Sequence, residues 1–224
     1  MSDFFRSHKP ILVASMGRSG STLCWRAISE ALVINKFGAA GSLFRKYLAK
    51  RIRSEAWDLR TDRIFPGRVY KTHALADELP SDFDGRIVFL FGCASDAALS
   101  VVSCRQRYGE DWVSEHFQHL RAIGSFDELG NYDVLQFEKQ IETWTNLEGH
   151  NIICLRYEKL WDNVSALSEF LGFNVELPER RIRTTHNLQN LHNSDLFLAN
   201  YKNLDDKISD LPDLIIKSHT DIIL

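Results

Sequence analysis

The segment between the first apolar run of the sequence and its first helical pattern reads Ala14-Ser15-Met16-Gly17-Arg18-Ser19-Gly20-Ser21-Thr22. Ile11–Ala14 predicts a short buried strand, and Leu23–Val33, with apolar residues three and four apart, predicts a helix. A small-residue loop between them leaves N–H groups free at a helix N-terminus, where the helix dipole favours an anion. Its glycines let an oxyanion approach the backbone, and Arg18 adds a guanidinium that fits phosphate or sulfate oxygens. The segment therefore predicts a phosphate-binding loop.

This loop differs from the phosphate-binding loop of nucleoside triphosphatases. That motif, G-x-x-x-x-G-K-S/T, needs a glycine and a lysine where this sequence has Ser15 and Ser21. Gly20 and Thr22 fit the motif, and the cation has moved to Arg18 inside the loop. A plain glycine- and serine-rich turn before a helix is the alternative interpretation of the segment taken alone.

Length and composition bound the class of protein. The chain has 224 residues, 44% of them hydrophobic, which suits one α/β domain over residues 1–224. The formal net charge of −3 gives no global signal for nucleic acid or a membrane surface. No apolar stretch reaches the roughly 18 residues of a spanning helix, and no signal peptide is evident, so the expected location is the cytoplasm. The cysteines lack a CxxC spacing, which favours reduced core thiols at Cys24, Cys93, Cys104 and Cys154.

Short apolar runs alternate with helical patterns along the rest of the chain. Further strands are predicted at Arg68–His73, Arg86–Phe91 and Ile152–Arg156. Helices are predicted at Ser42–Leu59, at Asp96–Tyr108 with Ser95 as its N-cap, and at Trp112–Ile123, Asp133–Leu147 and Val164–Leu171. The alternation predicts βαβ units, and hence an α/β three-layer sandwich with a central parallel sheet. The pattern weakens from Glu176 onward.

Polar residues gather where the predicted strands end. Lys71-Thr72-His73 ends one strand, Gly92-Cys93 follows the next, and Arg156-Tyr157-Glu158 ends the last. In open parallel sheets, ligands bind beyond the carboxyl ends of the strands. We therefore expect these residues and the loop to form one site.

Together these segments resemble the PAPS-dependent sulfotransferases (PAPS is 3′-phosphoadenosine 5′-phosphosulfate). Gly17–Thr22 is similar to that family's 5′-phosphosulfate loop, and Tyr70–His73 to its strand ending in Lys-Thr-His. Arg86–Ser100 resembles its 3′-phosphate segment, and Leu155–Leu160 its Arg-Tyr-Glu-Asp-Leu element. The four segments follow the family's order over residues 11–160. The resemblance implies a P-loop-like phosphosulfate-binding loop and transfer of a sulfuryl group from PAPS to an acceptor hydroxyl or amine. The leaving product would be adenosine 3′,5′-bisphosphate (PAP).

The resemblance also implies roles for individual residues. His73 would take the acceptor proton as general base, because an imidazole titrates in a suitable range. Lys71 would stabilise charge on the transferring group, and Arg18, in place of the more usual lysine, would neutralise the bridging and leaving oxygens. Tyr157 would lie near the adenine, and no metal ion is expected. The 5′-phosphate would be held by Ser19, Gly20, Ser21 and Thr22. The plainer alternatives are a core histidine, a surface lysine and a packing tyrosine.

One position departs from the family's pattern. The family carries an arginine eight residues before its serine, where this sequence has Gly92, although Ser100 is present. That loss removes a charge-assisted contact to the 3′-phosphate. Arg107 is a candidate substitute, because it lies about 20° from Ser100 around the helix, although about 10 Å further along its axis. Other candidates lie in a late basic segment, at Arg180, Arg181 and Arg183.

Three hypotheses on function are open at this point. The first is a PAPS-dependent sulfotransferase. The second is a P-loop kinase or nucleotide hydrolase, against which stand Ser21 at the Walker lysine position and the lack of a magnesium-binding aspartate after Arg86–Phe91. The third is a non-enzymatic binding protein that has lost PAPS, motivated by Gly92.

The acceptor is expected to be a small molecule or a saccharide. The predicted helix Ser42–Leu59 has a basic face, and no aromatic-rich substrate lid is evident, which favours a polar acceptor such as a saccharide. The plainer interpretation of that face is a solvated helix surface. Nucleic acid is not expected as a partner, and the sequence indicates no particular oligomeric state.

Overall fold

A six-stranded sheet runs through the part of the chain that the structure describes. The computed structural model describes residues 8–38, 41–180 and 194–218. The strands are β1 (Ile11–Ser15), β2 (Arg53–Glu55), β3 (Val69–Thr72), β4 (Arg86–Phe91), β5 (Asn151–Arg156) and β6 (Leu214–Lys217). The helices are α1 (Ser21–Phe37), α2 (Ser42–Ile52), α3 (Ala94–Tyr108), α4 (Glu110–Leu120), α5 (Phe137–Thr145), α6 (Val164–Leu171) and α7 (Ser194–Ser209). Short 3₁₀ turns are η1 (Ala76–Glu78), η2 (Phe126–Glu128) and η3 (Tyr157–Lys159).

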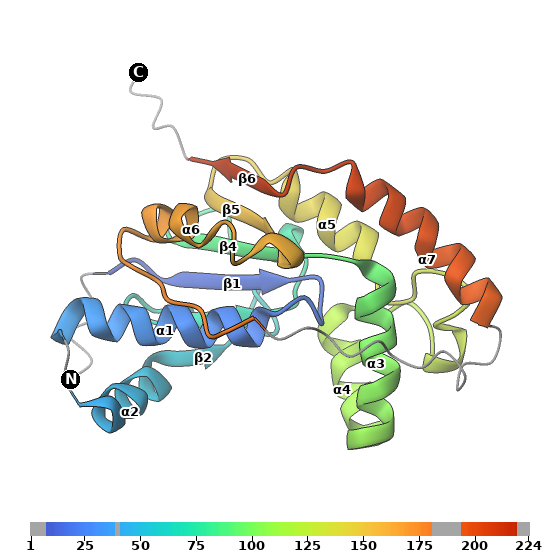
Figure 1. Ribbon diagram of the computed structural model, residues 1–224, viewed down its shortest axis with the longest axis horizontal. Helices are drawn as coiled ribbons and strands as arrows, with labels where there is room; N and C mark the ends of the chain where they lie inside the picture. The colour runs from blue at the N-terminus through green and yellow to red at the C-terminus, as the bar shows by residue number, and fades with distance from the viewer. Residues whose placement is uncertain (1–7, 39–40, 181–193, 219–224) are drawn as a thin grey trace.

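The sheet has the strand order β2-β3-β1-β4-β5-β6. Neighbouring strands from β2 to β5 pair in parallel, and only the last pair, β5 with β6, is antiparallel. The order therefore turns at β1, which has β3 on one side and β4 on the other (Figure 1). In doubly wound sheets such a switch point is where a ligand-binding crevice forms, and the loop after β1 begins there.

Helices cover both faces of the sheet, so the predicted α/β three-layer arrangement is confirmed. Alternate residues of β1 point to opposite faces, and all five are buried. Ile11 and Val13 belong to the core under α1, α2 and α6, whereas Leu12 and Ala14 belong to the core under α3, α4, α5 and α7. A strand with apolar side chains on both faces needs a helical layer on each, which explains why the Ile11–Ala14 run signals this fold.

The strand register brings the polar strand ends together. Ala14 is paired with Thr72 of β3, and Ser15 with Leu90 of β4. Phe91, the last residue of β4, is paired with Arg156 of β5. The segments that follow these strands therefore leave the same edge of the sheet, and α3 and α4 lie beyond that edge (Figure 1).

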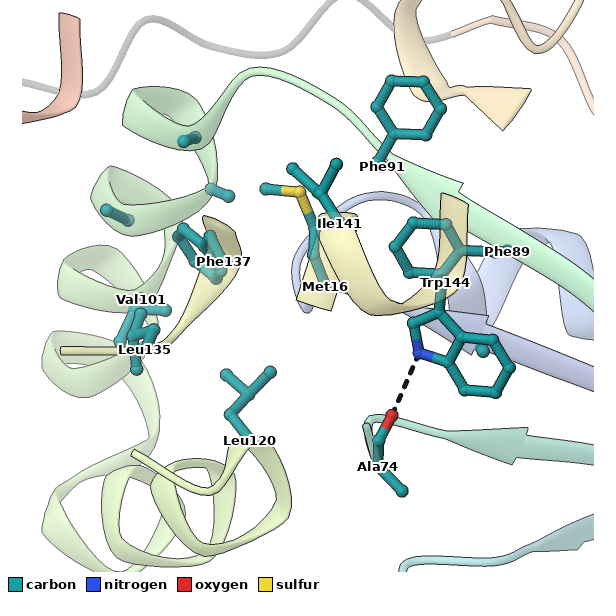
Figure 2. Close-up of a cluster of buried hydrophobic side chains, with 14 of the residues drawn as sticks. Met16, Ala74, Phe89, Phe91, Val101, Leu120, Leu135, Phe137, Ile141 and Trp144 are labelled. Atoms are coloured by element: carbon teal, nitrogen blue, oxygen red, sulfur yellow. Dashed lines mark hydrogen bonds between the residues drawn. The ribbon is translucent and has the colours of Figure 1, made fainter. Parts of the chain in front are cut away.

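The larger core also fixes the backbone that follows β3. Figure 2 shows Trp144 of α5 beside Phe89, with ring centroids 5.9 Å apart, and its indole N–H donates a hydrogen bond to the Ala74 carbonyl at 3.1 Å. The Gln140 amide, on the same helix, donates to the carbonyl of His73. Two buried side chains of α5 thus hold the turn immediately after Lys71-Thr72-His73.

The predicted helix Ser42–Leu59 is wrong in its second half. The helix ends at Ile52, and Arg53 takes an extended conformation with φ −74° and ψ 137°. Arg53–Glu55 then pairs with β3 as the edge strand β2. The apolar spacing continued past Ile52, but pairing with a neighbouring strand, which periodicity does not reveal, decides the local structure. Arg53 also closes the helix, because its guanidinium donates to the Ala49 carbonyl at 3.2 Å.

The other boundaries differ from prediction by smaller amounts. Helix α3 begins at Ala94 with Cys93 as its N-cap, so Ser95 lies inside the helix rather than capping it. Helix α5 begins at Phe137, later than predicted, because Gln136 takes a left-handed conformation with φ 56°. Helix α7 and strand β6 lie in the region where the sequence pattern had weakened.

Candidate functional site

A cavity of about 1230 Å³ opens at the carboxyl ends of the parallel strands. Its wall includes most of the residues that the sequence singled out: Arg18, Gly20, Ser21, Thr22, Lys71, His73, Ser100 and Tyr157. Ser19 and Arg107 are not part of this wall. Residues more than 130 positions apart in the chain thus share one surface, as the rule for parallel sheets predicted.

The loop after β1 has the backbone of an anion-binding turn. Gly17, Arg18 and Gly20 have positive φ values of 90°, 53° and 85°. Such turns aim successive N–H groups into one concavity, and the 17-residue helix α1 begins directly after them with no acidic residue in its first turn. A Cβ on Gly20 would lie 2.4 Å from ring carbons of Tyr157. Position 20 therefore needs glycine for its conformation and for the close approach of Tyr157.

Arg18 joins the loop to helix α3. Its Nε donates a hydrogen bond to the Ser100 hydroxyl at 2.9 Å, and its guanidinium carbon lies 5.8 Å from the centre of the Trp112 ring. The structure thus places the predicted loop cation beside the predicted 3′-phosphate serine. This contact joins residues 82 positions apart, and the motifs alone gave no signal of it.

The loop hydroxyls have different surroundings. Ser19 is 2% exposed, and its hydroxyl donates to the Leu90 carbonyl of β4 at 2.9 Å, which ties the loop to the sheet. The backbone N–H of Ser19 is therefore its remaining donor toward an anion. Ser21 lines the cavity. Thr22 also lines it, and its hydroxyl accepts a hydrogen bond from the Lys71 ammonium at 3.4 Å.

His73 lies at the base of the cavity and is 5% exposed. Its Nδ1 is 3.1 Å from the carbonyl oxygen of Ser15 and 3.0 Å from the hydroxyl of the same residue. A carbonyl oxygen only accepts, so the tautomer with the proton on Nδ1 satisfies this contact and leaves Nε2 unprotonated. Burial, together with the nearby His116 and Lys71, holds the pKa of His73 well below its ordinary value. A neutral imidazole with a free Nε2 is the form that accepts a proton.

Lys71 lies in an aromatic corner of the cavity. Its ammonium is 5.1 Å from the centre of the Trp57 ring and 6.0 Å from that of Trp25. Burial lowers the pKa of Lys71, and the negative charge of Glu55 opposes that shift. The ring faces offer a cation partial compensation for lost hydration, which suits a lysine that reaches into a site.

Part of the cavity wall is made of aromatic side chains that the sequence motifs did not indicate. His116 of α4 stacks on Trp112 with centroids 4.7 Å apart, and its ring meets that of His73 edge-on at 5.6 Å. His119 stacks on Trp57 at 4.0 Å. The spacing of Trp112, His116 and His119 along one helix places them on one face, and that spacing was the available signal. The partner Trp57 follows the unpredicted strand β2.

The last residue of β5 and the two residues after it make different contacts. Arg156 pairs with Asp213 at 2.5 Å and does not line the cavity. Tyr157 packs on Gly20 and meets Trp161 edge-on at 5.7 Å, so the two rings form the wall next to the loop. Glu158 turns toward β4, where its carboxylate accepts the N–H of Cys93 at 3.2 Å.

Carboxylates occupy the start of helix α3. A Cβ on Gly92 would lie 2.9 Å from both carboxylate oxygens of Glu158. From α7, the carboxylate of Asp205 accepts the N–H of Ala94 at 2.5 Å and that of Ser95 at 3.3 Å. The position where the family resemblance implies an arginine therefore faces one acidic side chain, and a second one caps the adjacent helix N-terminus.

The candidate substitutes for that arginine lie elsewhere. Arg107 is exposed, with its guanidinium 5.5 Å from the centre of the Tyr108 ring, so the structure does not bring it to the cavity. Arg180 lies over Trp161, at 5.7 Å from the ring centre. Arg181 and Arg183 lie outside the described residues. Of the two candidates that the structure describes, Arg180 contacts a residue of the cavity wall and Arg107 does not line the cavity.

Neither a metal-binding cluster nor a membrane-spanning helix is found among the described residues. Within the ranges 8–38, 41–180 and 194–218, no group of three or more histidine, cysteine or acidic side chains is arranged to hold a metal ion. The described helices include none with the length and apolar character that a membrane crossing requires.

The fold and the loop define an α/β protein with a P-loop-like anion-binding turn. No protein-family model matches the sequence, and comparison with curated proteins gave no match. Among solved structures, the chain is similar to mouse sulfotransferase SULT7A1 complexed with PAP, with 15% identity and a TM-score of 0.44 over 93% of this chain and 86% of that one. It is also similar to retinol dehydratase in complex with androsterone and the inactive cofactor PAP. There the identity is 12% and the TM-score 0.41, over 89% of this chain and 64% of that one.

Proposed function

We propose that this protein is a sulfotransferase that moves a sulfuryl group from PAPS to an acceptor hydroxyl or amine. The proposal rests on one observation: Arg18, Lys71 and His73 line the same cavity, next to a loop with the backbone of an anion-binding turn. Two cations and a neutral imidazole beside a phosphate-binding loop are the groups that in-line sulfuryl transfer needs. A polar acceptor such as a saccharide stays the expected class.

Each residue of the site would have a separate role in the transfer. The loop N–H groups of residues 17–22 would hold the 5′-phosphate of the donor, and Tyr157 would bound its nucleoside side. Nε2 of His73 would take the acceptor proton as the acceptor oxygen or nitrogen forms its bond to sulfur. Arg18 and Lys71 would stabilise the charge that develops on the sulfuryl and bridging oxygens as the bond to the leaving phosphate breaks.

The test is release of PAP from PAPS over a panel of hydroxyl and amine acceptors. The wild-type protein is expected to release PAP faster with at least one acceptor, and His73→Ala is expected to lower that rate about 1000-fold. PAP affinity, measured by calorimetry, should change by less than about threefold, because His73 is assigned to the acceptor proton rather than to the phosphates. Full transfer activity in His73→Ala would remove the base from the proposal.

A matched control separates chemistry from general damage to the fold. His150 lies away from the cavity, next to Phe83, with ring centroids 6.4 Å apart. His150→Ala should keep the wild-type transfer rate within about twofold, as expected for substitutions outside the site. Equal losses in the two variants would point to instability instead of a lost base.

A second candidate function is favoured by one observation. Glu158 and Asp205 place negative charge at the segment that the resemblance assigns to the 3′-phosphate, which is the arrangement expected of a protein that no longer binds PAPS. Calorimetry with PAP at millimolar concentration decides between the two. Absence of detectable heat would favour a diverged binding protein, and saturable binding would favour the enzyme.

A further inference from the structure

His116 is a buried polar side chain with an unused hydrogen-bonding atom. The residue is 7% exposed, it lines the cavity, and no described residue offers its Nε2 a hydrogen-bond partner. A buried imidazole nitrogen without a partner lowers the stability of the folded protein. Nε2 itself is enclosed while the residue lines the cavity, and an unsatisfied atom of this kind is expected where a bound ligand completes the contact.

The position of His116 places its ring beside the proposed reaction. Its Cε1 would lie 3.6 Å from a Cβ on Gly17, the first glycine of the anion-binding turn. On another side its ring meets His73 edge-on, with centroids 5.6 Å apart. Stacking on Trp112 at 4.7 Å holds the ring plane. The imidazole therefore lies between the loop that would hold the phosphosulfate and the proposed base.

Burial and the surrounding groups keep His116 neutral. Burial is the main cause that lowers its pKa to about 3, and Coulombic interactions with Arg18, His119 and Lys71 add to the shift. A neutral imidazole carries one N–H and does not titrate near pH 7, so it acts as a hydrogen-bond donor and not as a second base.

We propose that His116 is a further catalytic residue, whose Nε2–H donates a hydrogen bond to an oxygen of the sulfuryl group during transfer. The proposal rests on the sulfotransferase function proposed above. As the acceptor atom bonds to sulfur, the bond from sulfur to the bridging oxygen breaks and its electron pair stays on PAP. The acceptor proton passes to His73. His116 keeps its proton throughout and stabilises charge on a non-bridging oxygen, as oxyanion-stabilising donors do.

The test compares variants that differ in a single N–H group. His116→Phe keeps a flat ring that can stack on Trp112 but has no donor. It should lower kcat for PAP release at saturating PAPS and acceptor about 100-fold, with KM for PAPS within about threefold of wild type. His116→Gln places an amide N–H near the position of Nε2 and should recover about tenfold of that loss. His116→Met, of similar length but without a donor, should recover nothing.

A pH profile distinguishes this role from that of a base or a packing residue. Since His73 is the proposed base and His116 helps to lower its pKa, the acid limb of kcat/KM should persist in His116→Phe and move toward higher pH while the plateau falls, whereas loss of the base itself would remove the limb. His150→Phe, the same substitution away from the cavity, should keep kcat within about twofold. If His116→Phe fails to fold, the pair His116→Gln and His116→Met decides the question by the same criterion.

The outcomes separate this proposal from the one on which it rests. Wild-type turnover with an unchanged kcat in His116→Phe, or with equal rates in the Gln and Met variants, overturns the role of His116 and leaves the sulfotransferase standing. A wild-type protein that releases no PAP from PAPS, with any acceptor or with water, overturns both. A loss confined to variants without the N–H supports the proposal.

Discussion

The two ends of the proposed nucleotide site differ sharply in charge and in completeness. At the 5′ end, the positive-φ turn, Arg18 and Lys71 form a cationic cradle at the start of a helix. At the 3′ end, Gly92 faces the carboxylate of Glu158, and Asp205 already fills the N-terminus of α3. The same sheet edge thus carries one end prepared for an anion and one end that repels it.

The contrast indicates which part of the proposed donor the chain would hold more tightly. Arg18 connects the two ends, because its guanidinium reaches the Ser100 hydroxyl from the loop. A single cation shared between the ends would leave the 3′-phosphate with weaker compensation than the 5′-phosphosulfate. Binding of PAP should therefore depend strongly on the loop and weakly on the 3′-phosphate.

The largest expected effect on this comparison is at Gly20. Gly20→Ala places a methyl group 2.4 Å from the Tyr157 ring and should weaken PAP binding about 100-fold in calorimetry, because the turn must open to relieve the clash. Gly172 is a matched control, since it is left-handed like Gly20, with φ 73° and ψ 19° against 85° and 8°, and a Cβ there would meet Arg86 at an ordinary 3.7 Å. Gly172→Ala measures the cost of backbone strain alone. Equal affinities of the two variants would contradict the proposed role of the turn.

The next effect separates Arg18, which the structure places beside Ser100, from Arg107, which the sequence proposed as the partner of Ser100. Arg18→Ala should weaken PAP binding about 30-fold, as expected for the loss of about 2 kcal/mol of charge-assisted hydrogen bonding. Arg107→Ala should leave the affinity unchanged, because Arg107 is exposed outside the cavity. Competition with a fluorescent adenine nucleotide measures both. A loss in Arg107→Ala as large as that in Arg18→Ala would restore the helical-wheel prediction.

A smaller effect is expected at the acidic end. Glu158→Gln keeps an oxygen to accept the Cys93 N–H but removes one negative charge, worth about 1 kcal/mol to a nearby phosphate. The ratio of PAP affinity to AMP affinity should therefore rise about fivefold. Glu148→Gln, an exposed substitution that removes the same charge, should leave the ratio unchanged. An unchanged ratio in Glu158→Gln would place the 3′-phosphate elsewhere.

The two ends of the site also differ in how far the sequence could predict them. The loop, the strand Arg86–Phe91 and the gathering of strand ends follow from local patterns, because a buried strand and a positive-φ turn are specified by adjacent residues. The occupant of the α3 N-terminus could not be found this way, since Asp205 lies 111 residues from the Ala94 N–H that it accepts. The reach of Arg18 to Ser100 is equally non-local.

Arg107 illustrates the limit of periodicity. The helical wheel placed it on the same side as Ser100, but an angle around an axis does not say how far a side chain lies from the cavity. Similarly, the apolar spacing that suggested a helix to Leu59 concealed the edge strand that carries the chain to Trp57. The aromatic wall could not be found from local patterns because its members come from α4, the turn after β3 and the segment after β2.

The smallest effect concerns pH, and it arises from the charges of the 5′ end. A base works in its neutral form, so lowering its pKa moves the acid limb of kcat/KM to lower pH. With the pKa of His73 held well below 6.5, the rate should be nearly flat from pH 7.5 to pH 6, where an ordinary imidazole would have lost about three quarters of its activity. Lys71→Met removes one of the positive charges that lower this pKa, so its limb should move toward higher pH even as its plateau falls. Glu158→Gln, at the other end, should leave the limb where it is. A limb centred near pH 6.5 in the wild type, or one that ignores Lys71, would mean that another group supplies the base.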